Sequence, residues 1–555
     1  MAIYHAAESL ELPPVDLLSL LFDQDSPTCG SKEDSVIHAE AADPSICITK
    51  SQARDLLRKV AHGLRHQFSI GSSGPGKDVV VCVSSGQCLL PIMFYAVIAA
   101  GGIYSAASPA ATATDVARQI KQGRCNLIVC NKDAKDLAVA AARECNIPLD
   151  RVILMEPSPC SMKTLEGNLD VVSEEMLEWE RITDRKQVDE SVILMLYSSG
   201  TTGIPKGVLI SHTNLVAGAI NLGVVGQAYC AEQGFQYSAL AHLPAAHVSG
   251  ALIYFVIIMY AGGPTYWMPK FEFSKFLEYN KQHRITYMLT VPPIYLLIAK
   301  SPLVTDHFDS MKVALTAAAP LGKELQHAAS MKLGRGKTFI SQTWGMTETT
   351  GSVTGFSPGV RDDTGSISVL LPGMSMRIVD DDFNDVVPGQ PGEFLVKGPV
   401  VTKGYYDNPE ATKESFTSDG WLCTGDLGLE RNGLFYIVDR KKELIKYKGL
   451  QVAPAELEAL LMSHDQILDA AVIGVDGTGY SEGTEVPRAY IVPAPGGITK
   501  EEIMKFVEAK VAQHKKLRGG VVFMDVIPKS PSGKILRKEL RALAKKENEG
   551  TSSKL

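Results

Sequence analysis

A loop of small and hydroxyl-bearing residues in the middle of the chain has the composition of a phosphate-binding loop. It lies between two apolar runs, residues 192–196 and 208–211, that are predicted to be strands, and it is followed by Lys206. Glycines let backbone amides turn toward a polyanion, hydroxyl groups donate to its oxygens, and a lysine neutralises its charge. The string lacks the Walker pattern, which opens a helix, and a surface hairpin of the same composition is the alternative. The loop residues predicted to contact phosphate are Ser198, Ser199, Gly200, Thr201, Thr202 and Gly203.

Four side chains elsewhere could act beside such a loop. Glu348 ends the string GMTE, and a lone carboxylate suits Mg²⁺, because this ion binds one or two carboxylates together with phosphate oxygens. Lys534 follows a Ser-Pro-Ser-Gly loop that could carry a cation into a closed site. Asp426 lies in a Gly-Asp turn, and His247 follows the string LPAA. Each also has a plain structural interpretation, as a solvated surface charge or, for His247, as a hydrogen-bonded core residue.

Composition excludes several classes of protein. The chain has 555 residues, of which 45% are hydrophobic, and this is ample for large buried cores. Its formal net charge of -7 gives no electrostatic case for a nucleic-acid partner. Residues 505–555 nevertheless carry 13 Lys and Arg against 5 Asp and Glu. A basic end on an acidic protein suits a polyphosphate ligand, although a solvated basic helix would look the same.

The cysteines, the apolar runs and the chain end bear on location. The ten cysteines show no CxxC spacing, which indicates a reduced compartment and no structural zinc. The most apolar run, residues 251–262, is shorter than the roughly 20 residues of a membrane span, so it is predicted to be a core helix. The chain ends Ser553-Lys554-Leu555, the peroxisomal address. We therefore expect a peroxisomal protein, recognised by the import receptor, with no membrane span.

Short apolar strands alternate with amphipathic helices over most of the chain. Residues 51–68 have apolar positions at helical spacing, and residues 78–83, 126–130 and 151–155 are short apolar runs. This alternation is typical of a layered α/β fold with a largely parallel sheet. Residues 373–436 instead show alternating strands and Pro/Gly turns, which predict a small antiparallel barrel or sheet.

The predicted fold class is therefore α/β, with two domains. Residues 1–439 form a large N-terminal part of several subdomains, in which residues 365–438 are the β-rich one. Residues 440–555 form a smaller α+β domain, with helices near residues 453–463 and 500–514. Boundaries predicted in this way are accurate to a few residues.

Many strings of this sequence resemble those of the acyl-adenylate-forming (AMP-binding) superfamily. This superfamily contains acyl-CoA synthetases, beetle luciferases and the adenylation domains of peptide synthetases. The loop YSSGTTGIPKG resembles its signature loop, and further strings follow in the family's order: LPAAH, AAAPL, QTWGMTE, TGD, IVDR, KKELIKYKGLQVAPAELE and PKSPSGKILRKEL. The last two are most similar to the 4-coumarate–CoA ligase-like branch, including its peroxisomal fungal members.

The resemblance implies an ATP-dependent acid–CoA ligase. A carboxylic acid and ATP would give acyl-AMP and pyrophosphate, and coenzyme A would then give acyl-CoA and AMP, with Mg²⁺ held by Glu348. The acid would be an aryl, medium-length or branched one. An enzyme that loads a carrier protein, a luciferase-like oxidase and an inactive binding protein are the alternatives. The absence of a carrier domain disfavours the first. The last is disfavoured by the retention of Lys206, Glu348, Asp426, Arg440 and Lys534.

The resemblance also implies roles for single residues. Lys534 would cover the carboxylate and the α-phosphate during adenylation. The small domain would then rotate about Lys442 and bring Lys446 and Gln451 to the thiol site, while His247 would gate the passage between acid and thiol. The other residues implied to bind nucleotide or coenzyme A are Lys206, Ala319, Gln342, Thr343, Trp344, Gly345, Thr347, Asp426, Arg440, Lys448 and Gly449.

The acyl pocket implied by the resemblance is small and apolar. Its walls would be Ser249, Leu315, Ala318, Thr343, Gly345 and Ser352. A lining without charge suits an apolar tail and offers no partner to a second carboxylate. Thr343 stands where the branch commonly has Gly, so it should narrow the pocket or offer one hydrogen bond to an oxygenated acid. Ala317 adds a methyl group near the same wall, and we expect bulky planar rings to be disfavoured.

Overall fold

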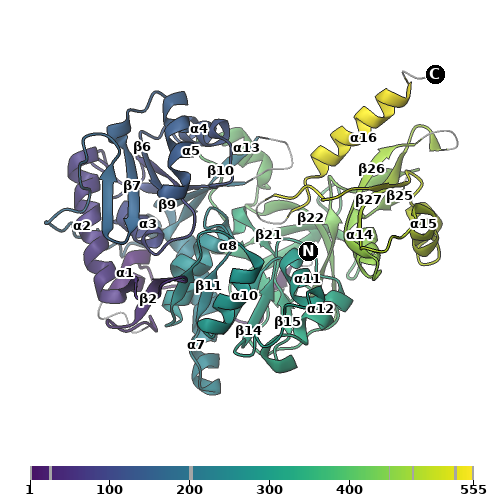
Figure 1. Cartoon of the computed structure of the whole chain (residues 1–555), viewed down its shortest axis with the longest axis horizontal. Coiled ribbons are helices and arrows are strands. Elements are labelled where there is room, and N and C mark those ends of the chain that lie inside the picture. Colours follow the sequence, from purple (N-terminus) through teal and green to yellow (C-terminus); the bar gives the residue numbers. More distant parts are fainter. Residues whose placement is uncertain are drawn as a thin grey trace.

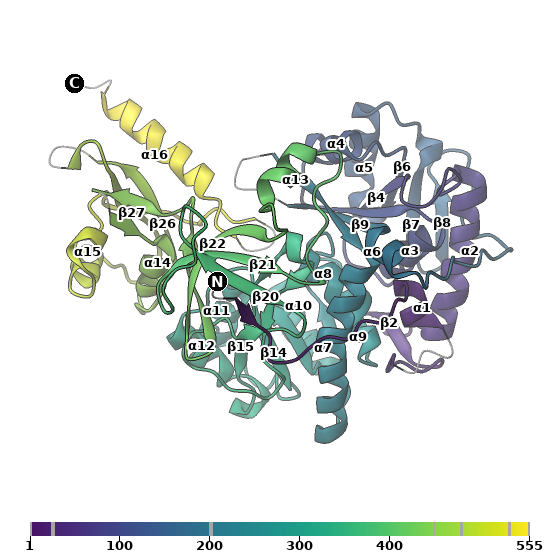
Figure 2. The same ribbon diagram turned by 180° about the vertical axis from the view of Figure 1, so that it is seen from behind.

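A computed structural model describes residues 3–23, 28–198, 204–448, 450–477, 481–530 and 534–552, the side chains of 548–552 excepted. Two α/β layers and a β-rich subdomain form a large body, and a smaller domain lies at one end of it (Figure 1). The predicted α/β class is confirmed, with the two-part division visible from both sides (Figures 1 and 2). In the part of the chain that the structure describes, no helix is both long enough and apolar enough to cross a membrane.

The first layer is a seven-stranded sheet in the order β10-β9-β5-β4-β6-β7-β8. Pairing is parallel from β9 to β7 and antiparallel at the two edges. The predicted strands at 78–83, 126–130 and 151–155 are confirmed to within two residues. The strands are β4 (Val79–Val83), β5 (Ile103–Ala107), β6 (Leu127–Asn131), β7 (Val152–Pro157), β8 (Cys160–Thr164), β9 (Val192–Ser198) and β10 (Lys206–Ser211). The helices beside them are α2 (Lys50–Phe68), α3 (Leu89–Ala99), α4 (Ala113–Gln122), α5 (Lys135–Glu144) and α6 (Arg185–Glu190).

The second layer is another seven-stranded sheet, in the order β15-β14-β13-β11-β12-β2-β3. All of its pairs are parallel except β2 with β3. The strands are β2 (Val36–Glu40), β3 (Cys47–Thr49), β11 (Ala239–Ala241), β12 (Thr265–Trp267), β13 (Tyr287–Thr290), β14 (Val313–Thr316) and β15 (Ile340–Gln342). The helices of this region are α1 (Leu17–Phe22), α7 (His212–Gln233), α10 (Phe273–Gln282), α11 (Pro292–Lys300) and α12 (Lys323–Ser330). The carboxyl ends of β14 and β15 lead into the strings AAAPL and QTWGMTE, so the sheet brings two motifs together.

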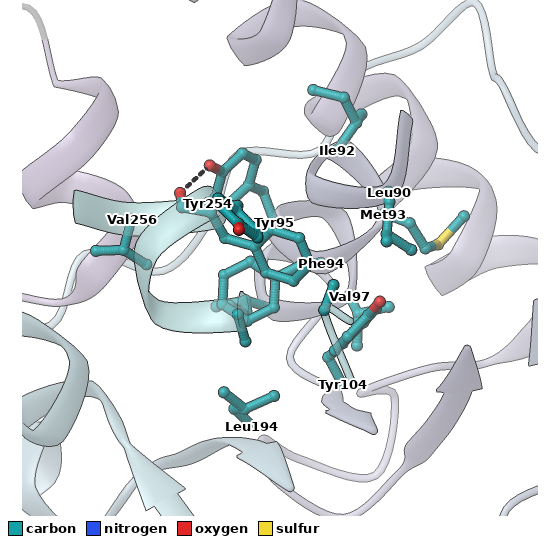
Figure 3. Packing of buried hydrophobic residues seen from close by; sticks show 14 of the residues in the cluster. Leu90, Ile92, Met93, Phe94, Tyr95, Val97, Tyr104, Leu194, Tyr254 and Val256 are labelled. Atoms are coloured by element: carbon teal, nitrogen blue, oxygen red, sulfur yellow. Dashed lines mark hydrogen bonds between the residues drawn. The ribbon is translucent and has the colours of Figure 1, made fainter. Parts of the chain in front are cut away.

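The core between the two layers is built from helices that are apolar on every side. Every residue of α3 is buried, and so is the apolar run that was predicted to be a core helix. That run comprises α8 (Val248–Ala251), a π-helical segment (Leu252–Ile257) and α9 (Ile258–Tyr260). The Phe94 and Phe255 ring centroids lie 5.1 Å apart, and the Tyr95 hydroxyl donates to the carbonyl of Phe255. Figure 3 shows Phe94 and Tyr95 of α3 packed close to Tyr254 of the π-helical segment. This packing fixes the position of the segment that begins at His247.

The β-rich subdomain is a five-stranded antiparallel sheet in the order β1-β20-β21-β22-β23. Its strands are β1 (Tyr4–His5), β20 (Ser375–Val379), β21 (Gly392–Lys397), β22 (Leu422–Arg431) and β23 (Leu434–Arg440). The antiparallel prediction is confirmed, but the sequence did not indicate that the N-terminal strand joins this sheet. Tyr4 pairs with Met376, and such distant pairing has no local signal.

The small domain has a hydrophobic core of its own, which includes Leu457, Val472 and Tyr490. Its elements are β24 (Ile445–Tyr447), β25 (Leu450–Val452), α14 (Pro454–Met462), β26 (Ile467–Asp476), β27 (Glu485–Pro493), α15 (Lys500–Glu508), β28 (Val521–Phe523) and α16 (Arg537–Ser552). The predicted helix near 453–463 is confirmed. The helix predicted over 500–514 ends at Glu508, and a separate 3-10 turn follows at Gln513–Lys515.

Candidate active site

Two adjoining cavities lie where the small domain meets the large body. The first, which we call the junction cleft, has a volume of about 300 Å³ and is lined from both sides. The second, the inner pocket, lies within the large body and has a volume of about 80 Å³. The residues that line both cavities are Ala318, Thr343, Trp344, Gly345 and Lys534. A molecule that spans the two cavities would therefore pass beside the Lys534 side chain.

Lys534 is the residue of the small domain that lines both cavities. Its amide donates to the Ser530 hydroxyl at 3.1 Å, and its carbonyl accepts from the Ser530 amide at 2.8 Å. These bonds close the loop whose tip, residues 531–533, lies outside the described residues. Burial lowers the pKa of the Lys534 amine, as does the Arg440 guanidinium, whereas the carboxylates of Asp426 and Glu348 act in the opposite sense. The amine is thus a desolvated cation with two acidic groups nearby.

Asp426 is held in place by two donors on the opposite side of the cleft. One carboxylate oxygen accepts from the Trp344 indole N–H at 2.8 Å, and the other lies 3.3 Å from Nε of Arg440. Asp426 and Arg440 are direct cross-strand partners on β22 and β23. The Trp344 ring packs edge-on against Phe394, with centroids 5.4 Å apart. The resemblance implied that Trp344 binds nucleotide, and the structure shows that its indole N–H also orients Asp426.

A second carboxylate, Glu348, forms a chain of contacts with Tyr405 and Lys206. Glu348 is buried, and its Oε1 accepts from the Tyr405 hydroxyl at 3.0 Å. The Lys206 ammonium lies 4.9 Å from the centroid of the Tyr405 ring. Burial and the Glu348 carboxylate both raise the pKa of Tyr405, so its hydroxyl keeps its proton. Tyr405 was not among the predicted site residues, and its place in the string KGYY was the only signal.

The predicted phosphate loop is described at its two ends. Ser198 ends β9 and is buried, and its hydroxyl has no hydrogen-bond partner among the described residues. Lys206 begins β10, antiparallel to β9 and directly paired with Ser198. Ser199, Gly200, Thr201, Thr202 and Gly203 lie outside the described residues. The β9–β10 pair therefore places the Ser198 hydroxyl, which has no partner among the described residues, and Lys206 side by side at the two ends of the predicted phosphate loop.

His247 stands at the entrance of the inner pocket. It caps α8, and its Nδ1 lies 2.8 Å from the Ser249 hydroxyl. Burial, together with the nearby Lys534 ammonium, lowers the pKa of His247 to about 4. The imidazole is consequently neutral near pH 7, and a neutral ring can lie beside an apolar tail without bringing a buried charge.

All six residues predicted to form the acyl pocket line the inner pocket. The Thr343 hydroxyl donates to the carbonyl of Thr354 at 2.5 Å and lies 2.9 Å from the Ser352 hydroxyl. Because that hydroxyl is already engaged in the wall, Thr343 acts by narrowing the pocket rather than by binding an oxygenated acid. Gly345 is required where it stands, since a Cβ there would lie 1.7 Å from the Gly351 carbonyl oxygen.

Several other wall residues were not predicted. They come from α7, the π-helical segment, β13 and the loop after β18 (Thr354–Gly355), and include Leu222, Ile253, Tyr287 and Phe356. Apolar residues at these positions cannot be told from ordinary core residues in the sequence. Of the predicted nucleotide-binding residues, Ala319, Gln342 and Arg440 line the junction cleft, whereas Thr347 lines the inner pocket.

Three of the predicted residues lie elsewhere on the small domain. Lys446 and Gln451 are exposed cross-strand partners in the β24–β25 hairpin, and Lys448 is exposed at its turn. None of the three lines the junction cleft or the inner pocket, and Gly449 lies outside the described residues. The Lys446 amide donates to Glu485 at 2.8 Å, so the hairpin is docked on β27. Their predicted role in thioester formation thus requires another position of the small domain.

Comparisons with known proteins agree with this architecture. A family model described as AMP-binding enzyme matches residues 32–406, and one described as AMP-binding enzyme C-terminal domain matches residues 456–534. A protein of Emericella nidulans named "Putative acyl-coenzyme A synthetase" is 46% identical over 100% of both chains. The protein named 4-coumarate–CoA ligase 1 of Petroselinum crispum is 36% identical over 89% of this chain and 88% of its own.

Solved structures share the fold. The ATP-bound MatB of Rhodopseudomonas palustris has a TM-score of 0.79 and 25% identity, over 95% of this chain and 98% of its own. The anthranilate CoA ligase AuaEII, solved with anthranoyl-AMP, has a TM-score of 0.81 at 20% identity, over 97% and 99% of the two chains. With family models matching both its large body and its small domain, the chain belongs to the AMP-binding enzyme family.

Proposed function

We propose that this protein is an ATP-dependent acid–CoA ligase that activates an apolar, non-planar carboxylic acid of medium or greater length in the peroxisome. One observation carries the proposal: Lys534 lines the junction cleft and the inner pocket at once. A cation at that point lies where a carboxylate in the inner pocket would meet a phosphate in the cleft. The activity itself agrees with the names of the relatives.

The first half-reaction joins the acid carboxylate to the α-phosphorus of ATP, and pyrophosphate leaves. No protein nucleophile takes part, so catalysis consists of positioning and of neutralising the negative charge that develops. Lys534 supplies the neutralising cation. Asp426, fixed by Trp344 and Arg440, is the acceptor for the ribose hydroxyls, and Lys206 and Ser198 face the phosphates.

Glu348 would hold the Mg²⁺ that accompanies ATP. Its carboxylate is buried and one oxygen already accepts from Tyr405, which fixes its orientation. A single oriented carboxylate fits Mg²⁺, since this ion is usually bound by one or two carboxylates together with phosphate oxygens. When bound, the ion would neutralise the charge of the phosphates, while Tyr405 keeps the carboxylate in place.

The second half-reaction transfers the acyl group to the thiol of coenzyme A. Here the β24–β25 hairpin is the candidate element, because it carries Lys446 and Gln451 on an exposed surface of the same small domain. A rotation of this domain would withdraw Lys534 and present the hairpin. His247, neutral near pH 7, would stand between the acid and the thiol.

A coupled assay distinguishes this function from its alternatives. The purified protein is incubated with ATP, Mg²⁺ and a panel of aryl, medium-chain and branched acids, and pyrophosphate and CoA thioester are measured separately. A ligase releases pyrophosphate only with added acid and forms the thioester in equal amount. An enzyme that loads carriers releases pyrophosphate without forming the thioester, and a binding protein does neither; either result would refute the proposal.

The peroxisomal part of the proposal rests on the final tripeptide, Ser553-Lys554-Leu555, which follows α16 and lies outside the described residues. Removal of these three residues should leave the assay above unchanged and send a fluorescently tagged protein to the cytosol, because a receptor reads the exposed tail. Punctate peroxisomal fluorescence after the deletion would contradict this location.

A further inference from the structure

A third cavity adjoins the inner pocket on the side away from Lys534. This distal chamber has a volume of about 380 Å³ and is lined by α7, β14 and the loop over residues 356–361. Helix α7 and strand β14 lie side by side in both views (Figures 1 and 2). The residues that line both the inner pocket and the distal chamber are Leu222, Tyr287, Leu315, Gly355 and Phe356. The two spaces are thus separated by one layer of side chains.

The inner pocket is too small to hold a long acid by itself. Its volume is about 80 Å³, whereas pockets for ligands usually measure roughly 300–1,000 Å³. The volume of the distal chamber by itself lies within that range. Gly355 contributes no side chain to the layer between them, and Phe356 is only half-buried, on a loop rather than on a strand. A change in the Phe356 rotamer is therefore the simplest way to connect the two spaces.

The distal chamber has several basic side chains in its lining, whereas Lys534 is the one basic side chain among the residues that line the inner pocket. The lining of the distal chamber includes Lys312, Lys337 and Arg361 but one acidic residue, Glu8. Asn221, on α7, also lines it, and the Asn221 carboxamide oxygen is buried without a hydrogen-bond partner among the described residues. The amide nitrogen of the same side chain donates to the Pro372 carbonyl at 3.2 Å, which fixes its orientation. Basic groups and an unpaired acceptor together suit an oxygen-rich group that can accept and donate hydrogen bonds.

We propose that the acyl chain of the substrate passes beside Phe356 into the distal chamber. The enzyme then takes an elongated acid whose apolar middle fills the inner pocket and whose far end carries carboxylate or hydroxyl oxygens. This inference rests on the proposed acid–CoA ligase function and names the substrate class of that same site.

The length of the acid gives the first test. The wild-type protein should have a kcat/KM at least about tenfold higher for dodecanoic acid than for hexanoic acid, because only the longer chain reaches the distal chamber. Val225→Trp fills the chamber from α7 without touching the inner pocket and should lower that ratio by roughly 10–200-fold. Val224→Trp is the matched control, since Val224 is 44% exposed and lines neither space.

The outcomes separate the two proposals. If no acid of any length is converted, the ligase function fails. If wild-type protein converts hexanoic acid as well as it converts dodecanoic acid, only the distal-chamber proposal is overturned. This comparison needs no variant, so it decides the matter even where Val225→Trp does not fold. An equal ratio in Val225→Trp and Val224→Trp also overturns the proposal.

The far end of the acid gives the second test. Dodecanedioic acid differs from dodecanoic acid only in its second carboxylate, so the ratio of their kcat/KM values reports on the distal chamber. Arg361→Glu should lower that ratio about tenfold, the low end for a charge-assisted hydrogen bond at a partly solvated site. Arg335→Glu is the control, since the Arg335 side chain is 75% exposed and lines neither space. Equal ratios in the two variants would show that the far end does not meet Arg361.

Discussion

The two sides of the junction cleft are built in different ways. On the large body the two acidic residues predicted for the site are fixed by neighbours: Asp426, in the cleft, by Trp344 and Arg440, and Glu348, which is not part of the cleft lining, by Tyr405. Of the residues predicted for the site, the small domain brings Lys534 into the cleft from a short loop, beside lining residues such as Glu458 and Arg537. Its other candidate residues lie in an exposed hairpin that lines neither cavity. Under the proposed function, the large body would bind the nucleotide in both half-reactions, and the position of the small domain would select which half-reaction proceeds.

This contrast predicts a large and selective effect at Lys534. Lys534→Ala should slow acid-dependent pyrophosphate release by roughly 100–1,000-fold, the cost of losing one group that stabilises charge in the transition state. Thioester formation from synthetic acyl-adenylate should stay close to normal, because Lys534 has no role in it. The exposed Lys538→Ala, on α16, serves as the control. Equal loss of both half-reactions in Lys534→Ala would mean that one position of the small domain serves both.

The hairpin should show the reverse selectivity. Lys446→Glu should slow thioester formation from preformed acyl-adenylate about 100-fold, which is typical of a misplaced reacting group, and leave pyrophosphate release unchanged. The Lys446 side chain is exposed, whereas its neighbours Ile445 and Tyr447 face the core, so the substitution should leave the packing of the small domain unchanged. Lys505→Glu makes the same charge change on the exposed face of α15 and should leave both steps intact. Slower adenylation in Lys446→Glu would contradict the separation of the two surfaces.

The sequence pointed to single site residues more readily than to the contacts between them. Glu348, Asp426 and Arg440 were named because they lie in strings that resemble the family's, and the structure places Asp426 and Arg440 in the junction cleft. The contacts that hold them were missed, since Tyr405 lies 57 residues from Glu348 in the chain and meets it only in the fold. The apolar walls Leu222 and Tyr287 had no signal at all, because burial in a pocket and burial in a core select the same residue types.

The same limit applied to the fold. Parallel strands such as β4 and β6 were predicted because they are short apolar runs between helices. The N-terminal strand β1 was not, since His5 pairs with Ser375, 370 residues later, and two residues carry no pattern. The position of Lys534 in the cleft likewise depends on tertiary contacts, which no local spacing of residues predicts.

On the large body, the Thr343 side chain should set the width of the inner pocket. Thr343→Gly removes a side chain that is bonded into the wall at Thr354 and should raise kcat/KM for planar or bulky acids relative to the best substrate. The expected change is roughly 10–200-fold, the range for small differences in an apolar pocket. Thr343→Val keeps the volume without the hydroxyl and should leave the ranking of the acids unchanged. A ranking that shifts equally in both variants would assign the selectivity to the hydroxyl instead.

The smallest expected effect is on the pH dependence of the protein's stability, through His247. Burial lowers the pKa of His247 to about 4 from its ordinary value of 6.5, so the folded protein binds a proton there less readily than the unfolded chain does. Stability should therefore fall as the pH drops from about 6.5 to about 4, with this histidine contributing about 2 kcal/mol of the loss by pH 5. His247→Gln cannot titrate, and its apparent Tm should decrease less than that of the wild type between pH 7 and pH 5. The exposed His327→Gln should decrease as the wild type does. If His247→Gln and wild type lose the same number of degrees, His247 is not held neutral by burial, and its place beside the apolar pocket must be explained in another way.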